Sequence, residues 1–200
     1  LERQGLAERR LAPAEELEAA LDVSVALLLL THVHYKTGAM HDMARLTRAA
    51  HDAGALVLWD LSHSVGAVPV DLSGCEADFA VASGYKYLNG GPGAPALAFV
   101  ARRHHAGLQQ PLTGWFGHAA PFSFVDDYAP APSIERMRVG TPPVLSLAAL
   151  DSALDIYDGV DLVALRAKAD RLFDIFSSIV VPECPDLELV TPMEPEKRGS

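Results

Sequence analysis

The sequence predicts an α/β fold built around a mainly parallel sheet. Two apolar runs of strand length, Val23–Leu30 and Ala55–Asp60, flank the segment His41–Ala53, whose apolar residues recur at helical spacing. Both runs are continuously apolar, which is typical of parallel strands that are covered on both faces. A strand, a helix and a second strand in this order form a crossover unit. The carboxyl ends of the two strands then lie at one edge of the sheet, where such folds bind their ligands.

The other elements follow from similar patterns. Pro13–Leu21 opens with a proline and acidic residues and continues with strong helix formers, which predicts a helix. We also expect strands at Asp78–Ser83 and Ala94–Val100, helices at Pro143–Tyr157 and Val160–Ile179, and a candidate strand at Leu187–Val190. This organisation predicts a partial large domain over residues 1–158. A connector helix and the start of a truncated, smaller C-terminal domain are expected over residues 159–200.

Composition and charge exclude several classes of function. The formal net charge of -10 argues against a protein that binds nucleic-acid phosphates through a basic surface. No apolar run approaches the roughly 20 residues that span a bilayer, and the charged opening segment fits neither a secretory signal nor a transit peptide. We therefore expect a cytoplasmic protein without a membrane partner. The two cysteines are far apart, and the pairs His32/His34 and His104/His105 lack a third ligand at a recognisable spacing, so no metal site is expected.

Lys86 is the first candidate catalytic residue. It follows the apolar strand at Asp78–Ser83 and precedes a loop with the sequence Asn-Gly-Gly-Pro-Gly. A lysine attacks a carbonyl only when it is unprotonated, so Schiff-base chemistry needs an amine whose pKa lies below its ordinary value of about 10.4. A strand end beside a glycine-rich loop offers such a setting. The alternative is an ordinary solvated loop lysine.

Asp60 is the second candidate, because it ends an apolar strand one unit before Lys86. A carboxylate at such a position costs desolvation energy unless a cationic group meets it. Pyridoxal phosphate supplies that partner, because its ring nitrogen has to stay protonated when the ring acts as an electron sink. Asp60 as a turn or helix-capping acid is the alternative. The two residues together, in this order, favour the cofactor.

Five blocks of the sequence resemble successive blocks of the kynureninase family. In chain order they are Thr31-His-Val-His-Tyr-Lys-Thr-Gly38, Trp59-Asp-Leu-Ser-His63, Tyr85-Lys-Tyr-Leu-Asn89, Leu112-Thr-Gly-Trp-Phe-Gly-His118 and Arg138-Val-Gly-Thr-Pro-Pro143. The resemblance runs from about Leu21 to Tyr157. It implies a fold type I pyridoxal-phosphate enzyme that hydrolyses L-kynurenine, or its 3-hydroxy form, to anthranilate (or 3-hydroxyanthranilate) and L-alanine in tryptophan catabolism, a route toward NAD biosynthesis.

The resemblance also assigns site residues. Lys86 matches the Schiff-base lysine and Asp60 the partner of the pyridine nitrogen. Thr31, His63 and Tyr85 match further cofactor contacts, with a phosphate contact ranked first for Tyr85 and a catalytic proton relay second. Trp115 and Thr141 match positions that build the neighbouring subunit's site in a homodimer. Thr141 departs from the asparagine of animal members, which leaves the preference between the two kynurenine forms open.

Two alternatives stay open at this point. Another fold type I enzyme, such as a cysteine desulfurase, would need a reactive loop cysteine, and neither Cys75 nor Cys184 lies in an evident electropositive loop. A noncatalytic fragment is the other alternative. It gains weight because the resemblance implies further parts, namely an aromatic residue that stacks on the cofactor and a C-terminal arginine that holds the substrate carboxylate.

Overall fold

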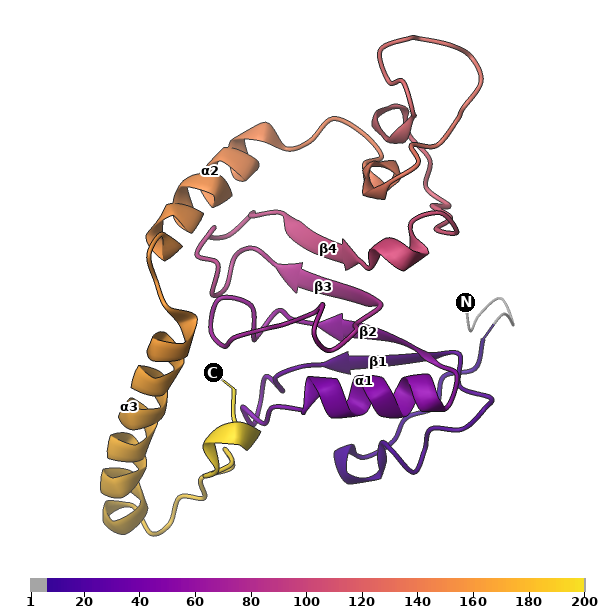
Figure 1. The fold of residues 1–200 in the computed structure, drawn as a ribbon. Helices are drawn as coiled ribbons and strands as arrows, with labels where there is room; N and C mark the ends of the chain where they lie inside the picture. The colour runs from indigo at the N-terminus through magenta and orange to yellow at the C-terminus, as the bar shows by residue number, and fades with distance from the viewer. Residues whose placement is uncertain (1–6, 200) are drawn as a thin grey trace.

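The computed structural model describes residues 7–199, which form an α/β fold around a four-stranded sheet. The strands are β1 (Leu27–Thr31), β2 (Leu56–Asp60), β3 (Phe79–Ser83) and β4 (Ala96–Val100), and they lie in chain order across the sheet. The first three are parallel and β4 is antiparallel to β3, so β1, β2 and β3 end at the same edge (Figure 1). The predicted mainly parallel α/β sheet is confirmed.

Helix α1 (Met43–Asp52) is the crossover between β1 and β2. Asp42 caps its first turn by accepting a hydrogen bond from the Arg45 amide at 2.9 Å. Gly54, with a φ of 84°, lets the chain leave the helix and enter β2. The helix covers one face of the sheet, and the shared core includes Met43, Leu46 and Ala50 packed with Leu28, Val57, Trp59, Ala80 and Ala82.

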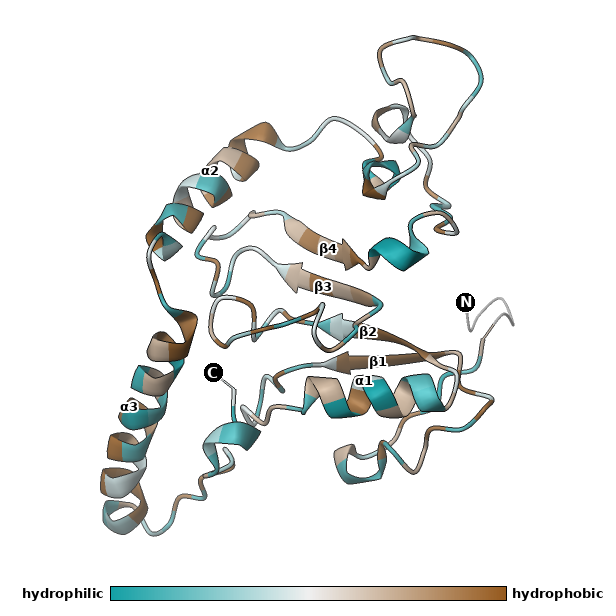
Figure 2. Ribbon diagram, viewed as in Figure 1, coloured by the Kyte–Doolittle hydropathy of each residue, from teal (hydrophilic) through white to brown (hydrophobic). Residues whose placement is uncertain are grey.

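The opposite face of the sheet is open. Alternate residues point to it, because side chains alternate between the two faces of a strand. Leu29 is 62% exposed and Leu27 is 46% exposed on β1, and Leu56 and Val81 are also exposed on their strands. Figure 2 shows that β1 and β4 are largely hydrophobic. Thr31, Asp60 and Ser83 share this open face, since they lie at even spacings from the exposed residues.

The helices that follow the sheet pass along the edge where β1, β2 and β3 end (Figure 1). They are α2 (Val144–Leu154), the short helix η6 (Asp155–Tyr157) and α3 (Leu162–Glu183). The chain then returns through η7 (Pro195–Lys197) to the loop after β1, where the Met40 amide donates to the Lys197 carbonyl at 2.8 Å. No helix in the described range 7–199 is long and apolar enough to cross a membrane.

Three expected elements differ from the structure. The helix predicted at Pro13–Leu21 is only a single turn, η2 (Ala14–Glu16), followed by further turns. The strand predicted at Val23–Leu30 begins at Leu27, because the chain turns at Asp22, whose carboxylate accepts from the Ser24 amide at 2.8 Å. The candidate strand at Leu187–Val190 is wrong, since that segment has no strand partner in the described structure.

Candidate active site

Three polar residues end the parallel strands at one edge of the sheet. Thr31 of β1 pairs in register with Asp60 of β2, and Ser83 ends β3. The Thr31 hydroxyl donates to the Val33 carbonyl at 3.0 Å, and one Asp60 oxygen accepts from the Ser62 amide at 2.9 Å. Among the described residues, the buried Ser83 hydroxyl has no hydrogen-bond partner. This edge therefore holds a carboxylate and a buried hydroxyl that no described group satisfies.

Lys86 and His63 meet beside this edge. The Lys86 amine lies 2.9 Å from Nε2 of His63, although 23 residues separate them in the chain. Burial first, and then the positive charge of Lys86, lower the pKa of His63, while the Asp60 carboxylate raises it. Lys86 and Asp60 thus both act on one imidazole, so the structure brings together three of the residues predicted for the site.

The loop that carries Lys86 is supported by α2 and η6. A Cβ on Gly84 or Gly90 would approach the Leu150 side chain of α2, at 3.2 and 2.9 Å respectively. The Tyr157 hydroxyl donates to the Tyr87 carbonyl, next to Lys86, and accepts from the Asn89 amide group at 3.3 Å. The glycines are needed here because they let the loop pack closely on the helix.

Tyr35 belongs to the same site and was not predicted from the sequence. It lies in the loop after β1, and its ring stacks on His63 with the centroids 6.3 Å apart. The Lys86 amine in turn lies 5.4 Å from the ring centroid of Tyr85, which is half exposed. Tyr35, Leu150 and Tyr157 carry no recognisable sequence signal, because their roles depend on segments that are distant in the chain.

His32 lies behind the site, buried against Trp59 with ring centroids 5.9 Å apart. Burial first, and then the charge of nearby His41, lower the pKa of His32 to about 4. This histidine is therefore neutral in the folded protein at neutral pH. Within residues 7–199, no group of three or more potential ligands is arranged to hold a metal ion.

Trp115 lies in the segment between β4 and α2, and Thr141 lies just before α2, the helix that supports the Lys86 loop. The segment 101–140 follows β4, which runs toward the opposite end of the sheet (Figure 1). Trp115 packs edge-on against Phe116 and Phe122, with centroids 4.8 and 5.9 Å away.

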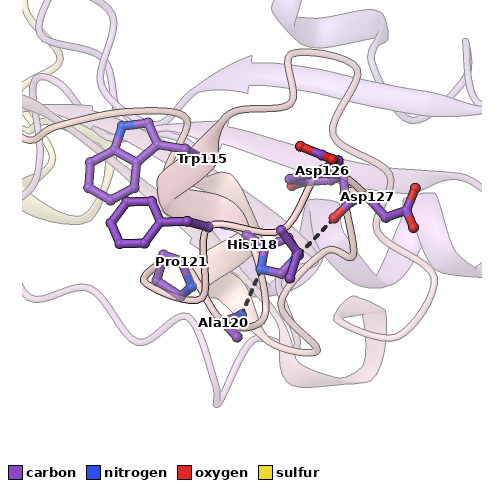
Figure 3. A pocket seen from close by; sticks show the side chains of 9 residues that line it. Trp115, His118, Ala120, Pro121, Asp126 and Asp127 are labelled. Atoms are coloured by element: carbon purple, nitrogen blue, oxygen red, sulfur yellow. Dashed lines mark hydrogen bonds between the residues drawn. The ribbon is translucent and has the colours of Figure 1, made fainter.

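Trp115 also lines a pocket with His118, Asp126 and Asp127 (Figure 3). His118 shapes this pocket by accepting from the Ala120 amide at 2.8 Å and donating to the Asp127 carbonyl at 3.2 Å. Lys86, Asp60 and His63 do not line this pocket. In this single chain, Trp115 and Lys86 do not form one site.

Residues 3–200 match the aminotransferase class-V family. The chain belongs to this family. The class-V chain is 51% identical over 205 residues to the kynureninase of Deinococcus radiodurans, an alignment that covers 98% of this chain and 50% of that protein. It therefore spans about half the length of the curated relatives it matches.

Solved structures share the fold of this class-V chain at low identity. An apo cysteine desulfurase from Thermococcus onnurineus superposes with a TM-score of 0.76 at 21% identity, covering 92% of this chain and 45% of that one. A C-DES mutant with glycine covalently linked to its pyridoxal-phosphate cofactor superposes with a TM-score of 0.75 at 19% identity, covering 92% of this chain and 48% of that one. The predicted fold type I class is confirmed.

Proposed function

We propose that the protein to which this chain belongs is a kynureninase, a hydrolase that cleaves L-kynurenine or 3-hydroxykynurenine to L-alanine and the corresponding anthranilate. The observation that carries the proposal is the contact between Lys86 and His63 beside Asp60 at the carboxyl edge of the parallel strands. The 51% identity to a curated kynureninase supports this activity over others on the same fold.

The residues at this edge fit pyridoxal phosphate. An amine that forms a Schiff base, a carboxylate that meets a protonated ring nitrogen, and an imidazole beside the ring are the groups this cofactor needs. The unused Ser83 hydroxyl is a further polar group available to a ligand. We assign Lys86 to the aldehyde carbon, Asp60 to the ring nitrogen, and Thr31, His63 and Tyr85 to further cofactor contacts. When bound, the cofactor supplies an electron sink for the electrons released at the substrate α carbon.

The roles of the protein groups follow from their positions. The Lys86 amine, when it is not bound to the cofactor, would be the base that moves the proton of the substrate α carbon. His63 accepts a hydrogen bond from the Lys86 amine, because burial and the lysine charge keep its imidazole neutral. For Tyr85, whose side chain is half exposed, we rank a hydrogen bond to the cofactor phosphate as the first assignment. A role as a proton relay is the second, because a hydroxyl both donates and accepts. The oxygen of the water consumed in the hydrolysis ends up in the anthranilate carboxylate, and a proton adds to the β carbon to complete the methyl group of L-alanine.

We also propose that the enzyme is a cytoplasmic homodimer with shared sites. Trp115 lies in the segment between β4 and α2 and lines a pocket that does not include Lys86, which supports its assignment to the neighbouring subunit's site. Thr141 keeps the same assignment from the resemblance alone. We retain the division into residues 1–158 of the cofactor domain and 159–200 leading into a smaller domain. We assign α3, within residues 159–200, as the connector helix.

The test uses the full-length protein. Loading with pyridoxal phosphate should give a visible absorption band, and borohydride should trap the cofactor on Lys86, as a mass shift of the peptide that contains it. The Lys86→Arg variant should show neither the visible band nor the mass shift. The control Lys168→Arg, which changes an exposed lysine on α3, should show both signals. Adding kynurenine should release fluorescent anthranilate. No band in the unaltered protein would favour a noncatalytic role.

A cysteine desulfurase remains the competing enzyme on this fold. Burial raises the pKa of the Cys75 thiol, which is opposite to what a sulfur nucleophile requires. Sulfide or persulfide formed from cysteine, with no anthranilate formed from kynurenine, would replace the proposed activity with this one.

A further inference from the structure

Arg198 is a buried cation that joins the returning C-terminal segment to α3. Its side chain is 3% exposed, and its guanidinium lies 3.1 Å from Asp170 and 3.0 Å from Asp174. The same group lies 4.2 Å from the centre of the Phe173 ring. A guanidinium that is stacked and paired in this way is held in one orientation. The segment around Arg198 is therefore fixed against α3.

The backbone of this segment is in turn bonded to the loop after β1. The Met40 amide donates to the Lys197 carbonyl at 2.8 Å, and the Gly199 amide donates to the Gly38 carbonyl at 2.6 Å. Ala39 and Arg198 form an antiparallel bridge between these two hydrogen bonds. A Cβ on Gly199 would overlap the Val33 side chain, so only glycine allows this approach. Arg198 thus anchors the loop as well as its own segment.

The anchored loop places Tyr35 over the Lys86 site. Val33 and Met40 pair across the base of the loop, and the Gly38 amide donates to the His34 carbonyl at 2.8 Å. Tyr35 lies at the tip, 67% exposed, and its ring stacks on His63 at an angle of 28°. An exposed tip has little packing of its own to hold it. Its position depends on the base of the loop.

We propose that Arg198 is a positioning residue for the Lys86 site, acting through residues 38–40 and the ring of Tyr35 on His63. The role in the loaded enzyme rests on the proposed function. The coupling from Arg198 to His63 is independent of the proposed function, because every contact in it lies within this chain. Tyr35 covers His63 from the loop after β1, and the charged groups that act on this imidazole are Lys86 and Asp60.

The coupling is tested in the full-length protein with Arg198→Met, Arg198→Lys, Tyr35→Ala and the control Lys197→Ala. Lys197 is a matched control, because it neighbours Arg198 but its side chain is exposed and pairs with Glu194 at the surface. Hydrogen exchange at residues 38–40 should be roughly tenfold faster in Arg198→Met and unchanged in Lys197→Ala. Arg198→Lys, which keeps the charge, should recover part of the protection.

A second measurement follows His63 itself through the pH midpoint of its modification by diethylpyrocarbonate, located by mass spectrometry. Removing the cover of Tyr35 should raise this midpoint toward that of an ordinary histidine. Arg198→Met should shift it in the same direction, and the double variant should shift it no further than Tyr35→Ala alone. The pH midpoint of the cofactor's visible band should shift in the same direction in Tyr35→Ala and Arg198→Met, and no further in the double variant than in Tyr35→Ala.

The outcomes separate the two proposals. Faster exchange in Arg198→Met with an unmoved His63 midpoint would reduce Arg198 to a structural residue and overturn the coupling. An unmoved midpoint in Tyr35→Ala would do the same, and this variant changes an exposed tip that does not endanger folding. A missing visible band in the unaltered protein would instead contradict the proposed function, while the His63 midpoint would still report the coupling.

Discussion

The Lys86 amine lies 2.9 Å from Nε2 of His63, and the Asp60 carboxylate acts on the same imidazole from the end of β2. Two residues named from the sequence are thereby joined through a third. The charges of Lys86 and Asp60 have opposite effects on the pKa of His63, since the lysine lowers it and the carboxylate raises it.

Replacing Asp60 with asparagine should lower the turnover number of the full-length enzyme by about 10²-fold or more, because a neutral amide cannot hold a protonated ring nitrogen. The pKa of His63 should also fall further, since the carboxylate that raises it is gone. Steady-state anthranilate release and the His63 modification midpoint measure the two effects. Asp186→Asn, an exposed acid after α3, is the control, and equal losses in both variants would remove Asp60 from the site.

Replacing Asp78 with asparagine should destabilise the fold without altering the site. Asp78 is fully buried at the start of β3, at the end of that strand opposite Ser83. Burial by itself would raise the pKa of its carboxyl group, but hydrogen bonds lower it below its usual range, and their donors are His51, His104, the Val57 amide and Arg103. Losing the charge should cost about 3–5 kcal/mol in the free energy of unfolding.

Denaturant unfolding of the full-length Asp78→Asn variant measures this cost. The position of the cofactor's visible band should stay the same, because the cluster contacts none of the site residues named above. A variant of unchanged stability would contradict the structural role of this carboxylate.

His32 should make the protein sensitive to mild acid. Its folded pKa of about 4 lies below the ordinary value of 6.5, so the unfolded chain binds a proton first as the pH falls. The stability that the neutral histidine contributes is complete above pH 6.5 and is lost as the pH falls through 4, by up to about 1.4 kcal/mol per pH unit. Comparing unfolding free energies of His32→Gln and the parent between pH 7 and pH 4.5 checks this. Parallel curves would show that His32 is not responsible.

Mixing two inactive variants should restore activity if Trp115 serves the neighbouring subunit. A dimer of one Lys86→Ala subunit and one Trp115→Ala subunit has one site with both residues intact. Refolding the two variants together in equal amounts should recover about a quarter of the parent activity, since about half of the dimers are mixed and each carries one working site. If Trp115 and Lys86 act within one subunit, no mixture can recover activity.

Part of the candidate site could be predicted, because continuous apolar runs locate the strands and therefore the residues at their carboxyl ends. Asp60 and Lys86 follow apolar runs that become β2 and β3, and strand order then places them at one edge. Tyr157 and Tyr35 could not be predicted in the same way. Their partners, Tyr87 and His63, are 70 and 28 residues away, and only the packing of α2 and the loop after β1 brings them together.

The errors in the predicted elements have local causes. Pro13–Leu21 has helical composition, but its single turn gives way where the chain must bend back toward β1. Val23 has high strand propensity yet is 95% exposed, because Asp22 and Ser24 form a turn that Arg10 reinforces. In both cases a short-range hydrogen bond or turn outweighs propensity, which is only a weak preference.

The uncovered leucines on β1 have a consequence for anyone who produces these residues by themselves. Leu27 and Leu29 would meet solvent on an edge strand whose outer backbone groups have no neighbouring strand within the described sheet. An exposed apolar edge strand of this kind promotes association between copies of the chain. Produced by itself, this polypeptide should self-associate and bind dyes that report hydrophobic surface, and solubilising mutations would have to be placed on β1.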